Sequence, residues 1–137
     1  MKNKFDQNLQ VRKKITALRI AFTLLTMLLT YHLVIIAELI PFDKVWAGQL
    51  QSSEEMLVFE AFSIFMVVGI LAVFFAKYRQ LLKGIYNRGT NIFIWVIAAF
   101  FALNSLGNLF AESKVELVFG TSLTLTLSIL CFVVARR

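Results

Sequence analysis

Four long apolar runs, separated by polar connections, restrict the fold of this chain more than any other feature of its sequence. They cover about residues 15–37, 56–77, 91–111 and 117–135, and about 20 apolar residues let a helix cross a bilayer. A soluble domain of 137 residues could not hide 59% apolar residues in its core. The sequence therefore predicts an all-α polytopic membrane protein, with four transmembrane helices in a single up-down bundle over residues 1–137.

Basic residues gather at alternate ends of these runs. Six lysines and arginines lie in the first 19 residues, four between residues 77 and 88, and two at residues 136–137, whereas the opposite connections hold only Lys44 and Lys114. Cytoplasmic loops carry such an excess of lysine and arginine. We therefore expect a multi-pass protein of the cell membrane with both termini in the cytoplasm. This distribution also explains the net charge of +6 without a nucleic-acid partner.

The first run and the connection after it each have an alternative explanation. Residues 15–37 are longer than the apolar region of a typical signal peptide, and no A-x-A-like cleavage site follows, so we expect a retained first helix.

The connection 38–55 is the longest, and it contains Pro41, Trp46 and Gly48. At this length it is a lid, a partner surface or a segment lying along the membrane interface.

Local signals mark the ends of several predicted helices. Ser52 and Glu55 have the spacing of a capping box before the second helix, and Ser113 and Glu116 have it before the fourth. Gly84 follows the basic end of the second helix, where a glycine commonly stops a helix in a left-handed conformation. These signals predict sharp helix ends next to the connections.

Four threonines and one arginine recur along the first helix at spacings of 3, 4, 3 and 4 residues and form one stripe: Thr16, Arg19, Thr23, Thr26 and Thr30. We expect the threonines to bond to carbonyls of their own helix or to allow close packing, and Arg19 to extend toward the cytoplasmic interface. His32 lies about half a turn off this stripe. Because a histidine is costlier than a threonine to leave in lipid, we expect His32 to face the bundle interior.

Polar side chains occur at similar depth in all four helices, near the end that the charge distribution places outside. At roughly 1.5 Å per residue, one group lies within about two turns of that end: His32, Glu60, Asn104, Asn108, Thr121 and Thr124. Polar groups in hydrocarbon are costly unless they find partners or water. We expect these side chains to line one polar cavity that opens outward and binds a ligand.

Each of these residues also has a purely structural explanation. Glu60 near a helix amino end can complement the helix dipole. Asn104 and Asn108 can hold helices together, which is the more common role of amides inside membranes. His32 can be a packing residue with its hydrogen bonds satisfied. The coincidence in depth supports the alternative in which some of these residues line one polar cavity that opens outward.

Two further features predict packing rather than chemistry. Ala98, Ala102 and Ser105 share one stripe of the third helix and are small enough to let a neighbouring helix approach closely. Cys131 lies in an apolar stretch near the inner end of the fourth helix. We expect it to be a reduced, unreactive packing residue.

The sequence does not contain the residue patterns that most cofactor-binding and enzymatic sites require. One histidine and one cysteine cannot assemble a metal cluster within the chain, and no phosphate loop, dinucleotide fingerprint or Ser–His–Asp arrangement occurs. His32 and Glu60 can form an acid–base pair, the minimum for a proton relay or an isomerase. We therefore expect no metal and no cofactor, and we favour a non-enzymatic protein.

The stretch from Asn104 to Asn108, read Asn-Ser-Leu-Gly-Asn and followed by Glu116, resembles small, uncharacterised bacterial four-helix membrane proteins. That resemblance covers about a quarter of the chain and implies no activity. In its four spans, its long first outer loop and Glu60 early in the second span, the chain is also similar to EXPERA-type membrane proteins. That family binds or isomerises sterol-like ligands, but its catalytic histidine pattern has no match here, so no site residues follow from it.

Three functions are consistent with this pattern. The leading hypothesis is a membrane protein whose outer polar cavity binds a small amphipathic molecule or lipid. The second is an accessory subunit, whose polar groups and small-residue stripe meet another membrane protein. The third is a homodimeric ion- or proton-coupled small transporter, which a charge at the membrane midplane would favour; Glu60 and His32 both lie toward the outer side.

The charge distribution makes a direct prediction about topology. Reporter fusions after Arg137 and within residues 78–88 should both report the cytoplasm, whereas a fusion within residues 42–52 should report the outside, because lysine and arginine bias orients the helices. An external signal at the carboxyl end would require an odd number of spans and would contradict the four-span arrangement.

Overall fold

A computed structural model describes residues 2–111, 113–114 and 116–136 of the chain, and in this part all regular structure is helical. The long helices are α1 (Lys2–Ile36), α2 (Ser53–Leu82), α3 (Arg88–Asn108) and α4 (Thr121–Ala135). Two short 3-10 helices, η1 (Phe42–Lys44) and η2 (Trp46–Gly48), lie between α1 and α2, and a π-helical turn, η3 (Glu116–Gly120), leads directly into α4. The all-α four-helix bundle predicted from the sequence is confirmed.

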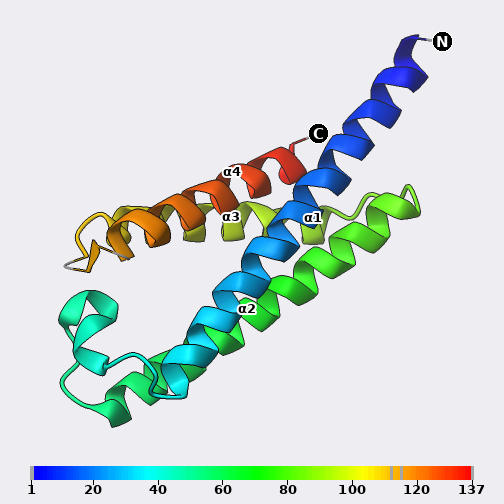
Figure 1. Ribbon diagram of the computed structural model, residues 1–137. Helices are drawn as coiled ribbons and strands as arrows, with labels where there is room; N and C mark the ends of the chain where they lie inside the picture. Colours follow the sequence, from blue (N-terminus) through cyan, green and yellow to red (C-terminus); the bar gives the residue numbers. More distant parts are fainter. Residues whose placement is uncertain (1, 112, 115, 137) are drawn as a thin grey trace.

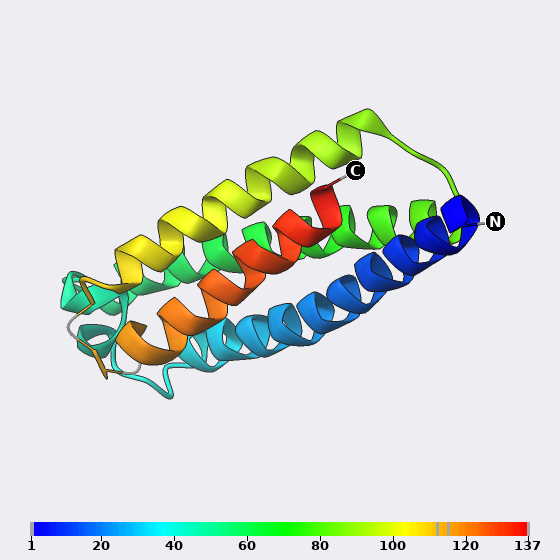
Figure 2. The ribbon, with the colours of Figure 1, turned by 90° about the horizontal axis from the view of Figure 1, so that it is seen from above.

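The bundle consists of two antiparallel helix pairs. α1 packs mainly against α2, and α3 mainly against α4, while contacts between α1 and α4 join the pairs. Figure 1 shows that the pairs cross near the C-terminus, with the first turns of α1 extending beyond the crossing, and that they lie farther apart at the other end, where η1 and η2 are found. Figure 2, seen from above, shows all four helices running along one common direction. We call the end with η1 and η2 the loop end and the opposite one the terminal end.

Each long helix is apolar and long enough to cross a membrane. The candidate spans are Lys4–Ile36, Ser53–Leu82, Arg88–Asn108 and Glu116–Ala135, the last being the continuous run of η3 and α4. Large apolar side chains such as Phe62, Phe65, Phe93 and Leu103 are exposed on the outer surface of the bundle. Such a surface is suited to lipid and unfavourable in water. The chain is accordingly a multi-pass membrane protein with four candidate spans.

The core is divided into two parts along the bundle axis. The larger cluster joins all four long helices and includes Leu18, Phe74, Phe101 and Leu127. A smaller cluster at the loop end joins the ends of α1 and α2 to the loop between them: Ile35, Val45, Leu50 and Met56. Loop 37–52 is therefore packed against the helices through buried apolar side chains of its own.

Two predicted helix ends are confirmed. The Ser52 hydroxyl accepts a hydrogen bond from the Glu55 amide (3.1 Å), and the Glu55 carboxylate accepts one from the amide of Gln51 (2.9 Å) rather than that of Ser52. At the other end of α2, Gly84 has φ +65°. The Ile85 amide donates to the Gln80 carbonyl (2.9 Å), as in a Schellman motif.

The start of α3 has a cap that the sequence analysis did not identify, because the Asn87 side chain accepts from the Thr90 amide (2.9 Å). For the capping box predicted at residues 113–116, Val115 lies outside the described residues. The Leu117 amide donates to the Ser113 carbonyl there (2.9 Å).

The threonine stripe of α1 bonds to its own helix. Thr23, Thr26 and Thr30 donate to the carbonyls of Arg19, Phe22 and Thr26, at 3.2, 2.8 and 2.9 Å. A hydroxyl that bonds back in this way can face lipid without an unsatisfied polar group. The expectation of back-bonding is confirmed for these three residues.

Small and hydroxyl residues lie at the contact between α3 and α4. Ser128 donates to the Ala98 carbonyl (2.9 Å), and Ser105 donates to the Thr121 carbonyl (3.3 Å). Ala98 and Ser105 are buried, and Ala102 is partly buried. Cys131 is a free, buried cysteine of the larger core cluster, as predicted.

Glycine substitutions test the close approach at this contact. A Cβ atom on Gly120 would lie 2.9 Å from Asn108 Nδ2, whereas one on Gly69 in α2 would meet nothing within 4 Å. Gly69→Ala should stabilise the protein by about 0.5–1 kcal/mol, since alanine favours helix. Gly120→Ala should lack this gain because the Asn108 amide must move.

Thermal unfolding of both variants in mild detergent measures the difference. In an Asn108→Ala background the obstruction is gone, so Gly120→Ala should then stabilise as Gly69→Ala does. Equal stabilisation by both alanines in the unaltered protein would contradict the proposed close contact.

Candidate functional site

The most constrained polar group at the loop end is the carboxylate of Glu60. Glu60 is completely buried, and each of its oxygens contacts a side chain from a different segment. Oε2 lies 2.6 Å from His32 Nδ1 of α1, and Oε1 accepts from the indole Nε1 of Trp46 at 2.7 Å. A buried carboxylate requires such partners, because a carboxylate transferred from water without them is strongly unfavourable.

Helix packing brings this pair together. α2 begins at Ser53 behind the Ser52 cap, so Glu60 lies about two turns inside the helix. His32 lies about one turn before the end of α1. Because α1 and α2 are antiparallel neighbours, the two residues meet at the same level. His32 faces the bundle interior, as expected, and its side chain is 14% exposed.

Trp46 connects loop 37–52 to two helices. Its indole binds Glu60, and its backbone amide donates to Oε1 of Glu116, at the start of η3, over 2.8 Å. Its ring also packs against Phe59, with centroids 5.0 Å apart. Trp46 has φ +54°, a left-handed conformation that is unfavourable for a bulky residue. Through this strained residue the loop contacts both helix pairs.

This arrangement can bind a proton and can orient a hydrogen-bonding group. The His32 imidazole and the Glu60 carboxylate form an ion pair when the imidazole is protonated. The Tyr31 ring lies edge-on to the imidazole, with centroids 5.9 Å apart. In the part of the chain that the structure describes, no three His, Cys, Asp or Glu side chains come together in a way that could hold a metal ion.

A second polar group lies between α3 and α4. Asn108 Nδ2 is 3.5 Å from Thr124 Oγ1, which itself donates to the Gly120 carbonyl at 2.8 Å. The Thr121 hydroxyl is buried and has no hydrogen-bond partner among the described residues. These contacts join two helices, which is the structural role that the sequence also allowed for Asn108.

The six predicted ligand-binding residues thus fall into different surroundings. His32 contacts Glu60, and Asn104 is exposed on α3. Asn108 contacts Thr124, which lies one turn from Thr121. Among the described residues, no hydrogen bond links the first pair to the second group. The shared cavity stays a prediction. Trp46 belongs to the connection for which the sequence left a lid, a partner surface and an interfacial segment open. Its bond to Glu60 was not foreseen, because no periodic pattern relates a loop to a helix.

The terminal end holds a polar group that the sequence analysis did not identify. Lys77 of α2 is buried and donates to Asn91 Oδ1 of α3 at 3.0 Å. Asn91 Nδ2 in turn donates to the carbonyl of Ala135, in the last turn of α4, at 2.8 Å. A lysine at the end of an apolar run usually extends to the interface. The sequence showed that position 77 is basic, but not that the Lys77 side chain is buried.

The chain matches no known protein family, no curated protein and no solved structure. Its resemblance to small bacterial four-helix membrane proteins therefore extends only to the architecture, four long apolar helices in one bundle. A function has to be argued from the geometry of the site.

A double-mutant cycle tests whether His32 and Glu60 are energetically coupled. We expect His32→Gln and Glu60→Gln each to lower the unfolding temperature, and the double variant to depart from their sum by roughly 0.5–3 kcal/mol, as contacting residues do. Thr126→Val is the matched control, because Thr126 is exposed on α4 and bonds to its own helix. His32→Gln and Thr126→Val should be additive. Additivity of the first pair as well would mean that the contact carries no coupling.

Proposed function

We propose that this four-span membrane protein binds a small amphipathic molecule at its loop end, beneath loop 37–52. One observation carries the proposal: the completely buried carboxylate of Glu60 is closed off on one side by a residue of that loop, Trp46. The other side is held by His32, which belongs to a long helix. A movement of the loop would therefore expose one carboxylate oxygen and leave the other in place.

The chemistry of Glu60 suggests the polar part of the ligand. Trp46 supplies a single N–H donor to Glu60 Oε1. A hydroxyl or an ammonium group can replace that donor, and an ammonium makes the stronger, charge-assisted hydrogen bond. A ligand whose head is an anion would be repelled by the same carboxylate. We therefore propose an amphipathic amine or alcohol.

The loop has the features of a lid that can open. Trp46 bonds to Glu60 through its indole and to Glu116 through its backbone amide. The backbone strain at this residue is worth about 1–3 kcal/mol and is relieved when the residue is released. The buried side chains of Val45 and Leu50 favour the closed state. Opposing terms of this kind make closure reversible.

The surroundings of the site suit an apolar tail. Phe59 packs on the Trp46 ring and is partly exposed on the outer surface of α2, next to exposed Phe62. A tail lying along these rings would stay in the hydrocarbon while its head group reaches Glu60. This arrangement supports binding of a molecule that enters from the membrane, rather than from water.

The contact between His32 and Glu60 favours a second candidate, a homodimeric proton-coupled transporter. The pair lies within the candidate spans and can take up a proton when a cationic ligand leaves. In this case ligand binding and proton binding would compete. Such competition also occurs in simple binding, so uptake of the ligand into vesicles driven by a pH gradient is what would distinguish transport.

Tryptophan fluorescence tests the lid directly. The chain contains two tryptophans, Trp46 and Trp95, so Trp95→Phe leaves Trp46 as the only reporter. Dodecylamine or dodecanol added to this variant should change the Trp46 emission in a saturable way, because the head group displaces the indole. Sodium dodecyl sulfate at matched, submicellar concentration should produce no saturable change.

Two carboxylate variants provide the controls. Glu60→Gln should abolish the saturable response, whereas Glu54→Gln, at an exposed position in the first turn of α2, should retain it. An equal response in Glu60→Gln would overturn the proposal. Native mass spectrometry from mild detergent adds a second measurement: a retained small molecule supports binding, and a stoichiometric protein partner would instead favour the accessory-subunit hypothesis.

A further inference from the structure

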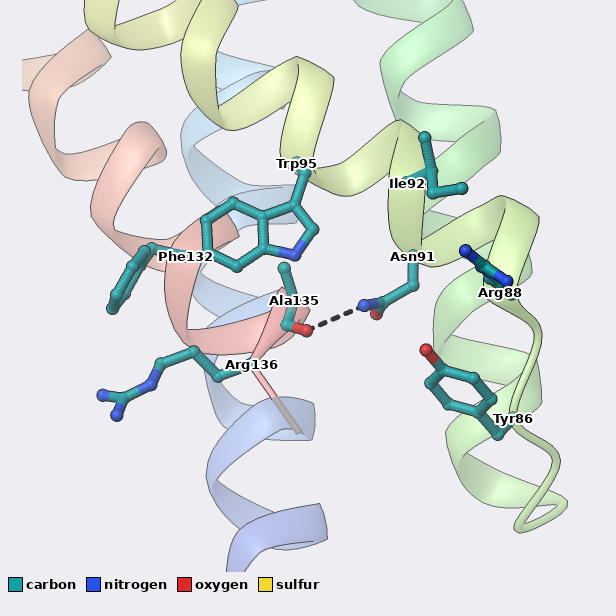
Figure 3. Close-up of a pocket in the computed structure, with 8 residues that line it drawn as sticks. All are labelled: Tyr86, Arg88, Asn91, Ile92, Trp95, Phe132, Ala135 and Arg136. Carbon is teal, nitrogen blue, oxygen red and sulfur yellow. Dashed lines mark hydrogen bonds between the residues drawn. The ribbon is translucent and has the colours of Figure 1, made fainter.

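A pocket of about 430 Å³ lies at the terminal end, between the start of α3 and the end of α4. Figure 3 shows the side chains that line it. The polar side chains of the lining are Tyr86, Arg88, Asn91 and Arg136. The apolar part of the wall is formed by Ile92, Trp95, Phe132 and Ala135. No acidic residue belongs to the lining.

The two arginines of the pocket have no acidic partner among the described residues. Arg88 and Arg136 lie on opposite sides of it (Figure 3), and Arg136 extends over the Phe132 ring at 5.3 Å from the centroid. Within residues 2–111, 113–114 and 116–136, no carboxylate lies at ion-pair distance from either guanidinium. Their charges are therefore available to an anion.

A third positive charge lies directly behind the pocket wall. Lys77 is only 3% exposed, yet its ammonium has no carboxylate partner in the described part of the chain. It donates to Asn91 at 3.0 Å and lies over the Tyr86 ring, 5.8 Å from the centroid. Both of these residues line the pocket. A buried ammonium without a counter-ion is unfavourable, and an anion in the pocket would supply one.

Helix geometry adds to the positive potential. α3 begins at Arg88 and has no acidic residue in its first turn. The Thr90 amide is already bonded to the Asn87 side chain, and the other first-turn amides favour an anion. At the same place the Ala135 carbonyl of α4 is already occupied by Asn91 Nδ2, as the dashed line in Figure 3 shows. This bond removes one acceptor at the carboxyl end of α4 from the wall.

We propose that this pocket binds the phosphate headgroup of an anionic phospholipid. Guanidinium groups bind phosphate through paired hydrogen bonds, and basic pockets between transmembrane helices are suited to anionic headgroups. The lipid source, rather than free phosphate, follows from the position of the pocket at the ends of two candidate spans. The rings of Trp95 and Phe132, both partly exposed, provide apolar contact for the glycerol and acyl region.

The test compares lipids on the full-length protein in nanodiscs. In phosphatidylcholine containing phosphatidylglycerol, we expect an unfolding temperature higher by about 3 °C or more than in phosphatidylcholine alone. Native mass spectrometry should show a preference for retained phosphatidylglycerol of roughly tenfold. The double variant Arg88→Gln/Arg136→Gln should lose both effects, and its fold should survive because both side chains are exposed.

A charge-matched control separates this pocket from the general basic surface. Arg79 and Lys83 are exposed at the same end of the bundle but do not line the pocket, so Arg79→Gln/Lys83→Gln should keep the preference for phosphatidylglycerol. Lys77→Met tests the buried charge: its unfolding temperature in phosphatidylcholine should equal or exceed that of the unaltered protein, and the increment from phosphatidylglycerol should shrink.

Three results would overturn the proposal. The first is equal retention of both lipids by the unaltered protein, and the second is an equal loss of preference in the Arg79→Gln/Lys83→Gln control. The third is full stabilisation by millimolar inorganic phosphate in phosphatidylcholine nanodiscs, which would assign the pocket to a soluble anion. The pocket lies at the opposite end of the bundle from Glu60, so these results are independent of the function proposed for the loop end.

Discussion

Inside a bilayer there is no water to satisfy a polar group, and this constraint explains the arrangement of nearly every polar side chain described above. Hydroxyls such as Thr26 and Ser63 bond to carbonyls of their own helices, and Ser128 bonds to a carbonyl of the neighbouring one. The ionisable groups need hydrogen-bond partners from other segments. Glu60 is held by His32 and Trp46, and Lys77 donates to the side-chain amide oxygen of Asn91 in α3. Each such contact holds separate parts of the chain in register.

These contacts give the two ends of the bundle opposite chemical character. At the loop end a buried carboxylate is covered by Trp46, so the proposed ligand carries a donor or a positive charge. At the terminal end, Lys77, Arg88 and Arg136 surround a pocket without an acidic residue, so the proposed ligand is an anion. The apolar core between the two ends is formed by all four long helices. A protein of this size can therefore keep two distinct polar sites apart by the length of its spans.

The sequence predicted the candidate site only in part. It indicated how deep each residue lies along its helix, but not which residues of other segments that residue contacts. His32 and Glu60 lie near the ends of antiparallel helices, so a depth estimate from residue counting was enough to bring them to one level. Asn104 also has the right depth, but it is exposed on α3. Depth along a helix is set by the sequence, whereas the direction of a side chain around the helix axis depends on where the neighbouring helices pack. Trp46 and Lys77 could not be assigned for the same reason, since their partners lie on other segments.

What the sequence by itself determined is local: four apolar helices, the Ser52 cap, the Gly84 stop and the back-bonded threonines. Hydropathy and short-range hydrogen bonding decide these features within a few residues of chain. The tertiary structure alone decided that loop 37–52 folds onto the helices, that Trp46 closes over Glu60, and that Lys77 is buried behind a basic pocket. Those features depend on contacts between residues far apart in the chain, and their energies arise only once the two helix pairs have come together.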